Sequence, residues 1–161
     1  MLIAAILAAA ASVPAAAVAG PAEPAVPDPI AVTGPHEPYL VAHAEGVQVQ
    51  ACSSVAGGYA RQLLAPRATL TDENGKPLAS HYGGPTWEAR DGSRVIGVRE
   101  AAASVDPTAI DWLRLRADST AAGADGDRLA ATTYIQRINT LGGRGHAAVD
   151  RRFRAASEQR S

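Results

Sequence analysis

The residues best suited to chemistry gather around one glycine-rich loop in the middle of the chain. Gly83-Gly84 permits backbone conformations that other residues avoid, and Pro85 then fixes the direction of the chain. An indole ring beside such a rigid loop can stack on a sugar or another flat ligand, while an imidazole and a carboxylate hold that ligand by hydrogen bonds. We therefore select as candidate ligand-binding residues His81, Trp87 and Asp91. The alternative is structural, with Trp87 as a core anchor and Asp91 as part of a turn.

A second set of side chains has the chemistry of a metal site. His43 and His81, together with Glu45, offer the imidazole and carboxylate ligands that zinc and copper accept. Their spacing matches no diagnostic motif, and a fourth ligand is not evident. No glycine-flanked serine has the setting of a hydrolase nucleophile. The sequence thus favours a protein without catalysis and without a cofactor, and a secreted metal-assisted enzyme using His43 and His81 is the alternative.

Composition limits the class of protein. The chain has 161 residues, 36 of them alanine, a single cysteine, and 15 basic residues against 16 acidic ones. This composition excludes a collagen, a coiled coil and a disulfide-rich miniprotein. The net charge of −1 also argues against nucleic acid as a partner. We expect one small domain that is a monomer.

The first 38 residues have the pattern of an exported protein. Residues 1–19 resemble a signal peptide, because the apolar run Leu2–Val13 is followed by the small-residue cleavage pattern Ala17-Val18-Ala19. An N-terminal membrane anchor is the alternative, although the run is short for a bilayer span. Six prolines in residues 20–38 then indicate an extended linker or a strap laid over the domain. The expected location is secreted or periplasmic, with no transmembrane segment after cleavage.

Residues 39–143 predict an all-β domain. Short segments rich in Val, Thr, Tyr and Trp alternate with turn residues, and Asn74-Gly75 and Asp91-Gly92 are strong hairpin signals. Helix is limited to one short turn within 101–106 or 117–131, because proline and glycine interrupt both stretches. The pattern favours an antiparallel sandwich or a barrel-like domain of about seven or eight strands. The predicted strands are 47–51, 59–64, 68–71, 76–82, 86–88, 94–100, 110–117 and 132–139.

Five fragments of the chain together form a recognisable pattern. In order, they are Ala44–Cys52, Pro66–Gly75, His81–Glu88, Asp91–Ser93 and Tyr134–Gly143. The most specific part is the Gly84-Pro85-Thr86-Trp87 block. In this order the fragments resemble one family of secreted bacterial and fungal proteins, the domain of unknown function 3455. The resemblance extends from about Leu40 to Gly143 and implies an exported single-domain protein with no established catalytic residues.

The segment after Gly143 departs from the family pattern. The resemblance implies a second cysteine and a tyrosine-rich final strand, whereas residues 144–161 hold five arginines, two acids and no cysteine. We interpret this segment as a disordered basic tail produced by a frameshift near codon 143. Cys52 would then be a family disulfide cysteine whose partner is absent. The alternative is a natural variant with a solvated tail.

Taken together, these features indicate an exported β-domain protein. The favoured function is a cell-envelope or extracellular module, either structural or binding a small molecule or glycan.

The signal-peptide hypothesis predicts the first residue of the exported protein. N-terminal sequencing of protein recovered from the producing cell should find a chain that starts at Gly20 or within a few residues of it. Soluble cytoplasmic protein that retains Met1 would contradict this prediction.

Overall fold

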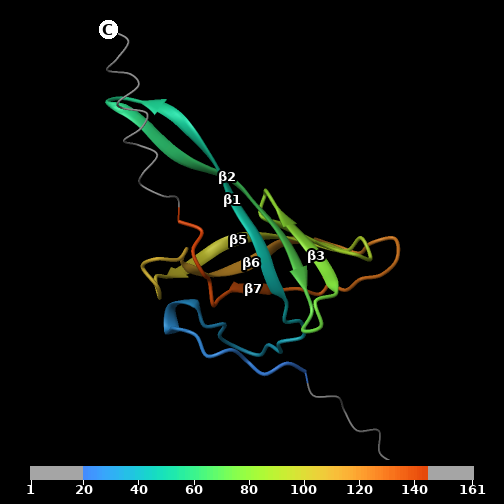
Figure 1. Ribbon diagram of the computed structural model, residues 1–161. Helices are drawn as coiled ribbons and strands as arrows, with labels where there is room; N and C mark the ends of the chain where they lie inside the picture. Colours follow the sequence, from blue (N-terminus) through green and yellow to red (C-terminus); the bar gives the residue numbers. More distant parts are fainter. Residues whose placement is uncertain (1–19, 145–161) are drawn as a thin grey trace, which may run out of the picture.

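The computed structural model describes residues 20–144, and these form one antiparallel sheet of seven strands in the order β1-β2-β3-β4-β5-β6-β7 (Figure 1). The all-β prediction is confirmed. Each strand pairs with its neighbour in the sequence, so the topology is a simple meander. The strands are β1 (His43–Val55), β2 (Gly58–Thr71), β3 (Pro77–Tyr82), β4 (Thr86–Ala89), β5 (Arg94–Ala103), β6 (Trp112–Ala121) and β7 (Tyr134–Arg137).

The two hairpins expected from their turn residues are present. Gly75 and Gly92 have φ of 77° and 81°, a left-handed conformation that suits glycine. Asp72 supports the first turn, because its carboxylate accepts hydrogen bonds from the backbone N–H groups of Asn74 and Lys76, both at 2.9 Å. These local signals set the register of β2 with β3 and of β4 with β5.

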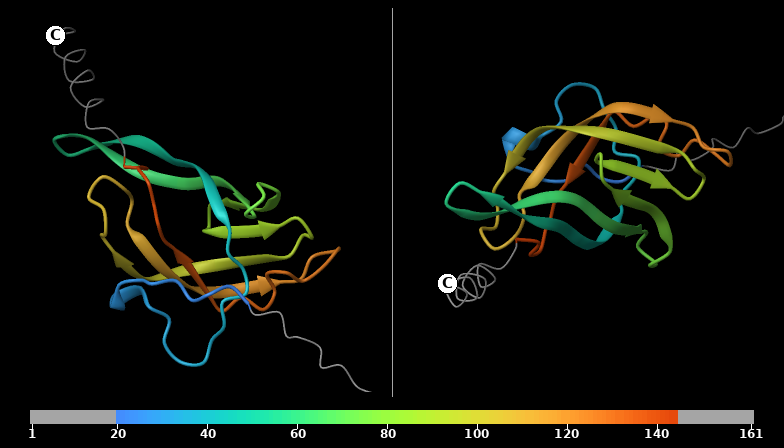
Figure 2. Two further views of the ribbon diagram at one scale, coloured as in Figure 1. Left: turned by 60° about the horizontal axis from the view of Figure 1, so that its bottom comes forward. Right: turned by 90° about the horizontal axis from the view of Figure 1, so that it is seen from above.

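The sheet curls over on itself. Figure 2 shows β1 and β2 on one side, β5, β6 and β7 on the other, and β3 and β4 joining the two sides at one end. One surface of the sheet therefore faces inward and the other faces outward. Opposite residues of antiparallel strands share a surface, so the register places Ala68, His81, Trp87 and Val95 together on the inner one.

Strand β2 is longer than the sequence indicates. Residues 59–64 and 68–71, expected as separate strands, form one continuous strand across Pro66. Proline is tolerated there because β2 pairs with β3 only through Ala68–Thr71, so Pro66 has a neighbouring strand on one side alone. Residues 47–67 thus form a two-stranded hairpin that projects beyond the rest of the sheet (Figures 1 and 2). We call this hairpin the arm.

The proline-rich segment, residues 20–38, lies along the outer surface of β5, β6 and β7, and we call it the strap (Figure 2). It contains a short 3-10 helix, η1 (Asp28–Ile30), whose Ile30 side chain is fully buried. Gln136 donates a hydrogen bond of 2.8 Å to the Ile30 carbonyl, and Arg114 donates one to the carbonyl of Ala31. Ordered packing thus begins before Tyr39, where the sequence placed the start of the domain.

The core occupies the inner surface of the curled sheet. Its buried members surround Trp87, and Leu40, just before β1, completes it at the margins together with leucines of β2, β3 and β6. The buried core residues are Ala79, Trp87, Ala89, Val95, Leu115 and Leu129. Three of these six are small or come from loops, so a single indole supplies much of the packed volume.

Helix contributes little to the part of the chain that the structure describes. Residues 20–144 contain the 3-10 helix η1 and no α-helix. Of the two stretches where the sequence allows a short helical turn, 101–106 forms none, because β5 continues to Ala103. The stretch 117–131 begins with the end of β6, and its residues 128–131 form two turns in which the N–H groups of Ala130 and Thr132 donate to the carbonyls of Asp127 and Leu129. No helix among these residues is long and apolar enough to cross a membrane.

Removing the Ile30 side chain should destabilise the domain. We expect Ile30→Ala to lower the free energy of unfolding by about 2–4 kcal/mol, because a fully buried side chain would leave a cavity between strap and sheet. Val98→Ala, at a side chain that is 44% exposed on β5, is the matched control and should cost less than about 1 kcal/mol. Urea denaturation measures both. Equal losses would mean that the strap does not contribute to stability.

Candidate functional site

His81 and Trp87 are direct neighbours across β3 and β4. Their rings stack with centroids 4.1 Å apart and an angle of 12° between the planes. The indole is 9% exposed and lies over Gly97, where an added Cβ would be 3.2 Å from the Trp87 ring. Trp87 is therefore a core side chain with His81 against it, and its ring has no open surface on which a sugar can stack.

His81 is a neutral, structurally engaged imidazole. Its Nδ1 donates a hydrogen bond of 2.9 Å to the carbonyl oxygen of Thr86. Burial lowers the pKa of His81 below its ordinary value of 6.5, and the positive charge of Arg137 on β7 lowers it further. The ring is therefore uncharged at pH 7, with its proton on Nδ1.

Asp91 fastens a turn to a loop that is distant in sequence. Its Oδ1 accepts hydrogen bonds from the Ser93 N–H at 2.9 Å and the Ser93 hydroxyl at 2.5 Å, while its Oδ2 accepts one from the Arg128 N–H at 3.0 Å. These hydrogen bonds, led by that of the Ser93 hydroxyl, lower the pKa of Asp91. Ser93 is fully buried and accepts a bond from the Leu129 N–H in turn. The structure thus joins Asp91 to Ser93 and Arg128, and brings together only His81 and Trp87 of the three candidates.

The two histidines of the metal hypothesis lie on opposite surfaces of the sheet. His81 is opposite Ala68 on the inner surface, and Leu70, two residues after Ala68, is on that surface too. His43 is opposite Thr71, the residue next to Leu70, so it lies on the outer surface. They are also two strands apart, and each strand spacing is about 4.8 Å. Within residues 20–144, no three His, Cys, Asp or Glu side chains come together as ligands for a metal ion. The geometry does not bring His43 and His81 to one ion.

Cys52 is an exposed, unpaired thiol on β1, opposite Arg61 of β2. The residues after 144, which include most of the expected tail, lie outside the described part of the chain, as does the expected signal peptide at 1–19.

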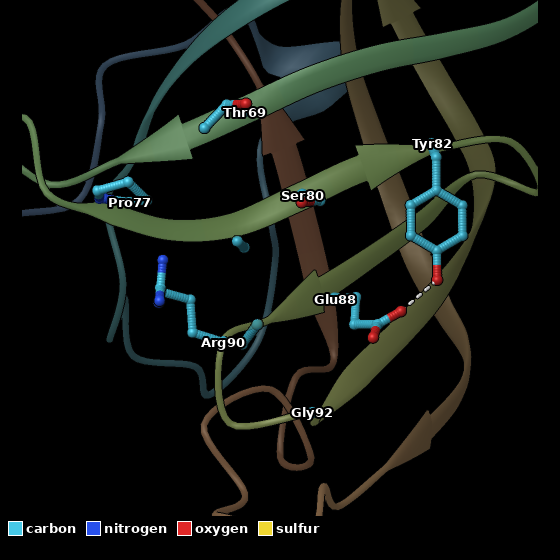
Figure 3. A pocket seen from close by; sticks show the side chains of 9 residues that line it. Thr69, Pro77, Ser80, Tyr82, Glu88, Arg90 and Gly92 are labelled. Atoms are coloured by element: carbon cyan, nitrogen blue, oxygen red, sulfur yellow. Dashed lines mark hydrogen bonds between the residues drawn. The ribbon is translucent and has the colours of Figure 1, made fainter.

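The outer surface of β3 and β4 carries a shallow hollow of about 520 Å³ (Figure 3). In this hollow the Tyr82 hydroxyl donates a hydrogen bond of 2.5 Å to Glu88 Oε2, and the bond raises the pKa of the tyrosine. The Arg90 guanidinium lies on the same surface, nearer the Pro77 end of the hollow (Figure 3). The lining residues are Thr69, Pro77, Ala79, Ser80, Tyr82, Glu88, Ala89, Arg90 and Gly92.

Residue types alone do not point to Tyr82, Glu88 or Arg90, although the order of residues in the sequence contains a signal for this surface. Side chains of a strand alternate between its two surfaces, so the residues next to His81 and Trp87 must point away from the core. Tyr82 and Glu88 are those neighbours. Once Trp87 is assigned to the core, the alternation of side chains along each strand predicts that Tyr82 and Glu88 are exposed on the outer surface.

The hollow combines an aromatic ring, a carboxylate, a guanidinium and hydroxyl groups. This set can bind the hydroxyl groups and ring faces of a small polar molecule. Among the described residues that line the hollow, Glu88 alone carries a carboxylate.

The fold and this site define a small all-β domain built on one curled antiparallel meander, with an open polar hollow on its outer surface. The chain matches the family described as "Protein of unknown function (DUF3455)" over residues 33–159 and belongs to this family. The match extends beyond residues 40–143 in both directions. It includes part of the strap, and it also covers residues 144–159, most of the segment whose residue types depart from the family pattern. No curated protein matches the chain, and no solved structure does.

The buried imidazole should make the domain less stable in weak acid. Because the folded-state pKa of His81 lies below 6.5, the unfolded chain binds a proton more readily, so stability should fall as the pH drops through 6.5 toward the folded-state value. Urea denaturation at a series of pH values measures this. His81→Gln should remove this loss.

His36 serves as the control because its effect has the opposite sign. Its hydrogen bond with Glu23 raises the pKa of His36, so it adds stability at low pH that is lost as the pH rises through its folded-state pKa. His36→Gln should therefore make the acid loss steeper. If His81→Gln leaves the pH profile unchanged, His81 is not the group that responds.

Proposed function

We propose that this protein is an exported module of the cell envelope or extracellular space that binds a small molecule or glycan in the hollow on β3 and β4. The observation that carries the proposal is the Tyr82–Glu88 pair, a hydrogen-bonded aromatic and carboxylate group on the lining of the hollow. Export is supported by the apolar run and the small-residue cleavage pattern in residues 1–19.

The lining suits a carbohydrate in particular. Tyr82 is 38% exposed, so part of its ring can pack against the C–H face of a sugar. Glu88 accepts hydrogen bonds from sugar hydroxyls, while the Arg90 guanidinium donates them. The volume of the hollow lies within the usual range of ligand sites. Because the hollow is open to solvent, its affinity for a sugar depends on these few groups.

A rigid base supports this surface. The backbone N–H of Arg90 donates a hydrogen bond of 3.0 Å to the Leu78 carbonyl, and β3 and β4 are paired from Ala79 to Tyr82. The opposite faces of these strands are fixed by the packed His81 and Trp87 rings. Little ordering is needed when a ligand binds, which lowers the entropic cost of association.

Binding should be found with an array of cell-wall oligosaccharides and then measured by NMR titration of the labelled protein with each positive oligosaccharide. We expect shifts at backbone amides of β3 and β4. Tyr82→Ala should weaken binding by roughly tenfold or more, because the stacking surface is lost. Glu88→Gln should weaken it several-fold through one altered hydrogen bond.

Tyr134→Ala is the matched control. Tyr134 is also 38% exposed and lies on β7, in a separate hollow formed with β6. Its removal should leave oligosaccharide binding unchanged. Loss of binding in Tyr134→Ala with retention in Tyr82→Ala would place the ligand in the other hollow. A complete lack of binding across the array and in small-molecule thermal-shift screens would contradict the proposal.

A further inference from the structure

Strand β1 presents an unprotected edge. It is the terminal strand of the sheet and pairs with β2 alone. From Gly46 to Val55 it contains no charged residue and no proline, two of the features that commonly protect edge strands from pairing. The bulge of the β1–β2 pair has its extra residue, Leu64, on β2 and not on β1. Among the residues that the structure describes, no strand pairs with the outer side of β1, so its outward backbone groups are open to a further strand.

The arm also exposes apolar side chains on both surfaces. Tyr59 is 70% exposed, and four other large apolar side chains of the arm are between 43% and 63% exposed: Val47, Val55, Leu63 and Leu64. A two-stranded hairpin is marginally stable in water on its own. Clustered apolar side chains on such a hairpin mark an interaction surface.

A second copy of the chain fits this edge without a charge conflict. Two β1 strands that pair antiparallel about a twofold axis must match residues of the same surface. With the axis at Ala51, Val47 lies opposite Val55 of the second copy, and Val49 lies opposite Ser53. Every residue within the paired stretch is uncharged.

The charges of the arm favour pairing of β1 with a second copy of the chain over pairing with the chain's own C-terminal residues. The arm carries Arg61 and Arg67 and no acid, and residues 145–161 also have a net positive charge, with four arginines against two acids. In the paired copies, the two β2 strands are separated by both β1 strands. That distance is about 14 Å, longer than the Debye length at physiological salt.

We propose that two copies of this protein associate through β1, antiparallel about a twofold axis at Ala51, to form one continuous sheet. Cys52 then lies one residue from the axis. It faces Gln50 of the second copy, and the two Cys52 residues are diagonal neighbours about 7–8 Å apart. This arrangement replaces the monomer expected from the sequence, and it does not depend on ligand binding in the hollow.

Crosslinking of the full chain tests the proximity of the two thiols. A short bismaleimide, which joins two thiols without oxidation, should convert the protein into a covalent dimer visible on a denaturing gel. Because Cys52 is the only cysteine, Cys52→Ser should abolish the product. Light scattering after size exclusion should show a dimer whose population rises with protein concentration.

A charge placed on the axis tests the register. Ala51→Lys brings two ammonium groups directly opposite each other and should raise the dimer dissociation constant by about tenfold. Ala60→Lys is the matched control, because Ala60 is also half-buried in the arm but lies on β2, opposite Ser53 and away from the edge. This control should dimerise like the unchanged protein.

Hydrogen exchange needs no substitution, so it tests the proposal even if a variant perturbs the arm. It distinguishes pairing of β1 with a second copy from pairing with the chain's own residues 145–161. Amides of residues 46–55 should become more protected as the concentration of the full chain rises. A monomer at all concentrations, with no crosslink, would overturn the proposal. So would concentration-independent protection that is lost when residues 145–161 are deleted, since the chain's own tail would then cover β1. Open-ended polymers would also contradict a closed twofold pair.

Discussion

The packing of Trp87 over Gly97 is the contact on which the rest of the domain depends. Alanine supplies much of the apolar composition, so few large side chains are available to fill the space inside a curled sheet. The indole fills that space only because Gly97 has no side chain, and an added Cβ there would also meet Leu115 at 3.3 Å. His81 covers the other side of the ring. One aromatic side chain thus covers the inner face of β4, β5 and β6, which are held side by side by their backbone hydrogen bonds.

This packing of Trp87 gives the two surfaces of β3 and β4 different surroundings. Ala79, Trp87 and Ala89 belong to the core, whereas Ser80, Tyr82 and Glu88 line the hollow from the other surface. His81 and Tyr82 are adjacent in the sequence, yet one packs against an indole while the other bonds to Glu88 at the surface. The rigidity of the outer surface follows from the packing of the inner one, because both are carried by the same paired backbone.

Local signals in the sequence predict much of the fold, and long-range contacts account for what they miss. Asn74-Gly75 and Asp91-Gly92 specify their turns within four residues, so both hairpins are predictable. The continuity of β2 across Pro66 is not, because it depends on which side of β2 lacks a neighbour. The burial of Ile30 depends on strands that lie far along the chain. For the site, residue types alone select Trp87 and Asp91 as ligand groups. The pairing register reveals that Trp87 faces the core. The hydrogen bonds of the folded chain reveal that the Asp91 carboxylate is already occupied by Ser93 and Arg128.

The strap and the sheet should fold at very different rates. Sheet formation in a meander proceeds through neighbours in the sequence, so its contacts close short loops and form quickly. The strap instead bonds to residues 83 and 106 positions away, through Ala31 with Arg114 and Ile30 with Gln136. Because these partners lie on β6 and β7, the strap can dock only after the last two strands are in place. Among the residues that the structure describes, the segment that leaves the ribosome first is therefore the last to reach its final position. Until then the outer surface of β5, β6 and β7 is open to chaperones.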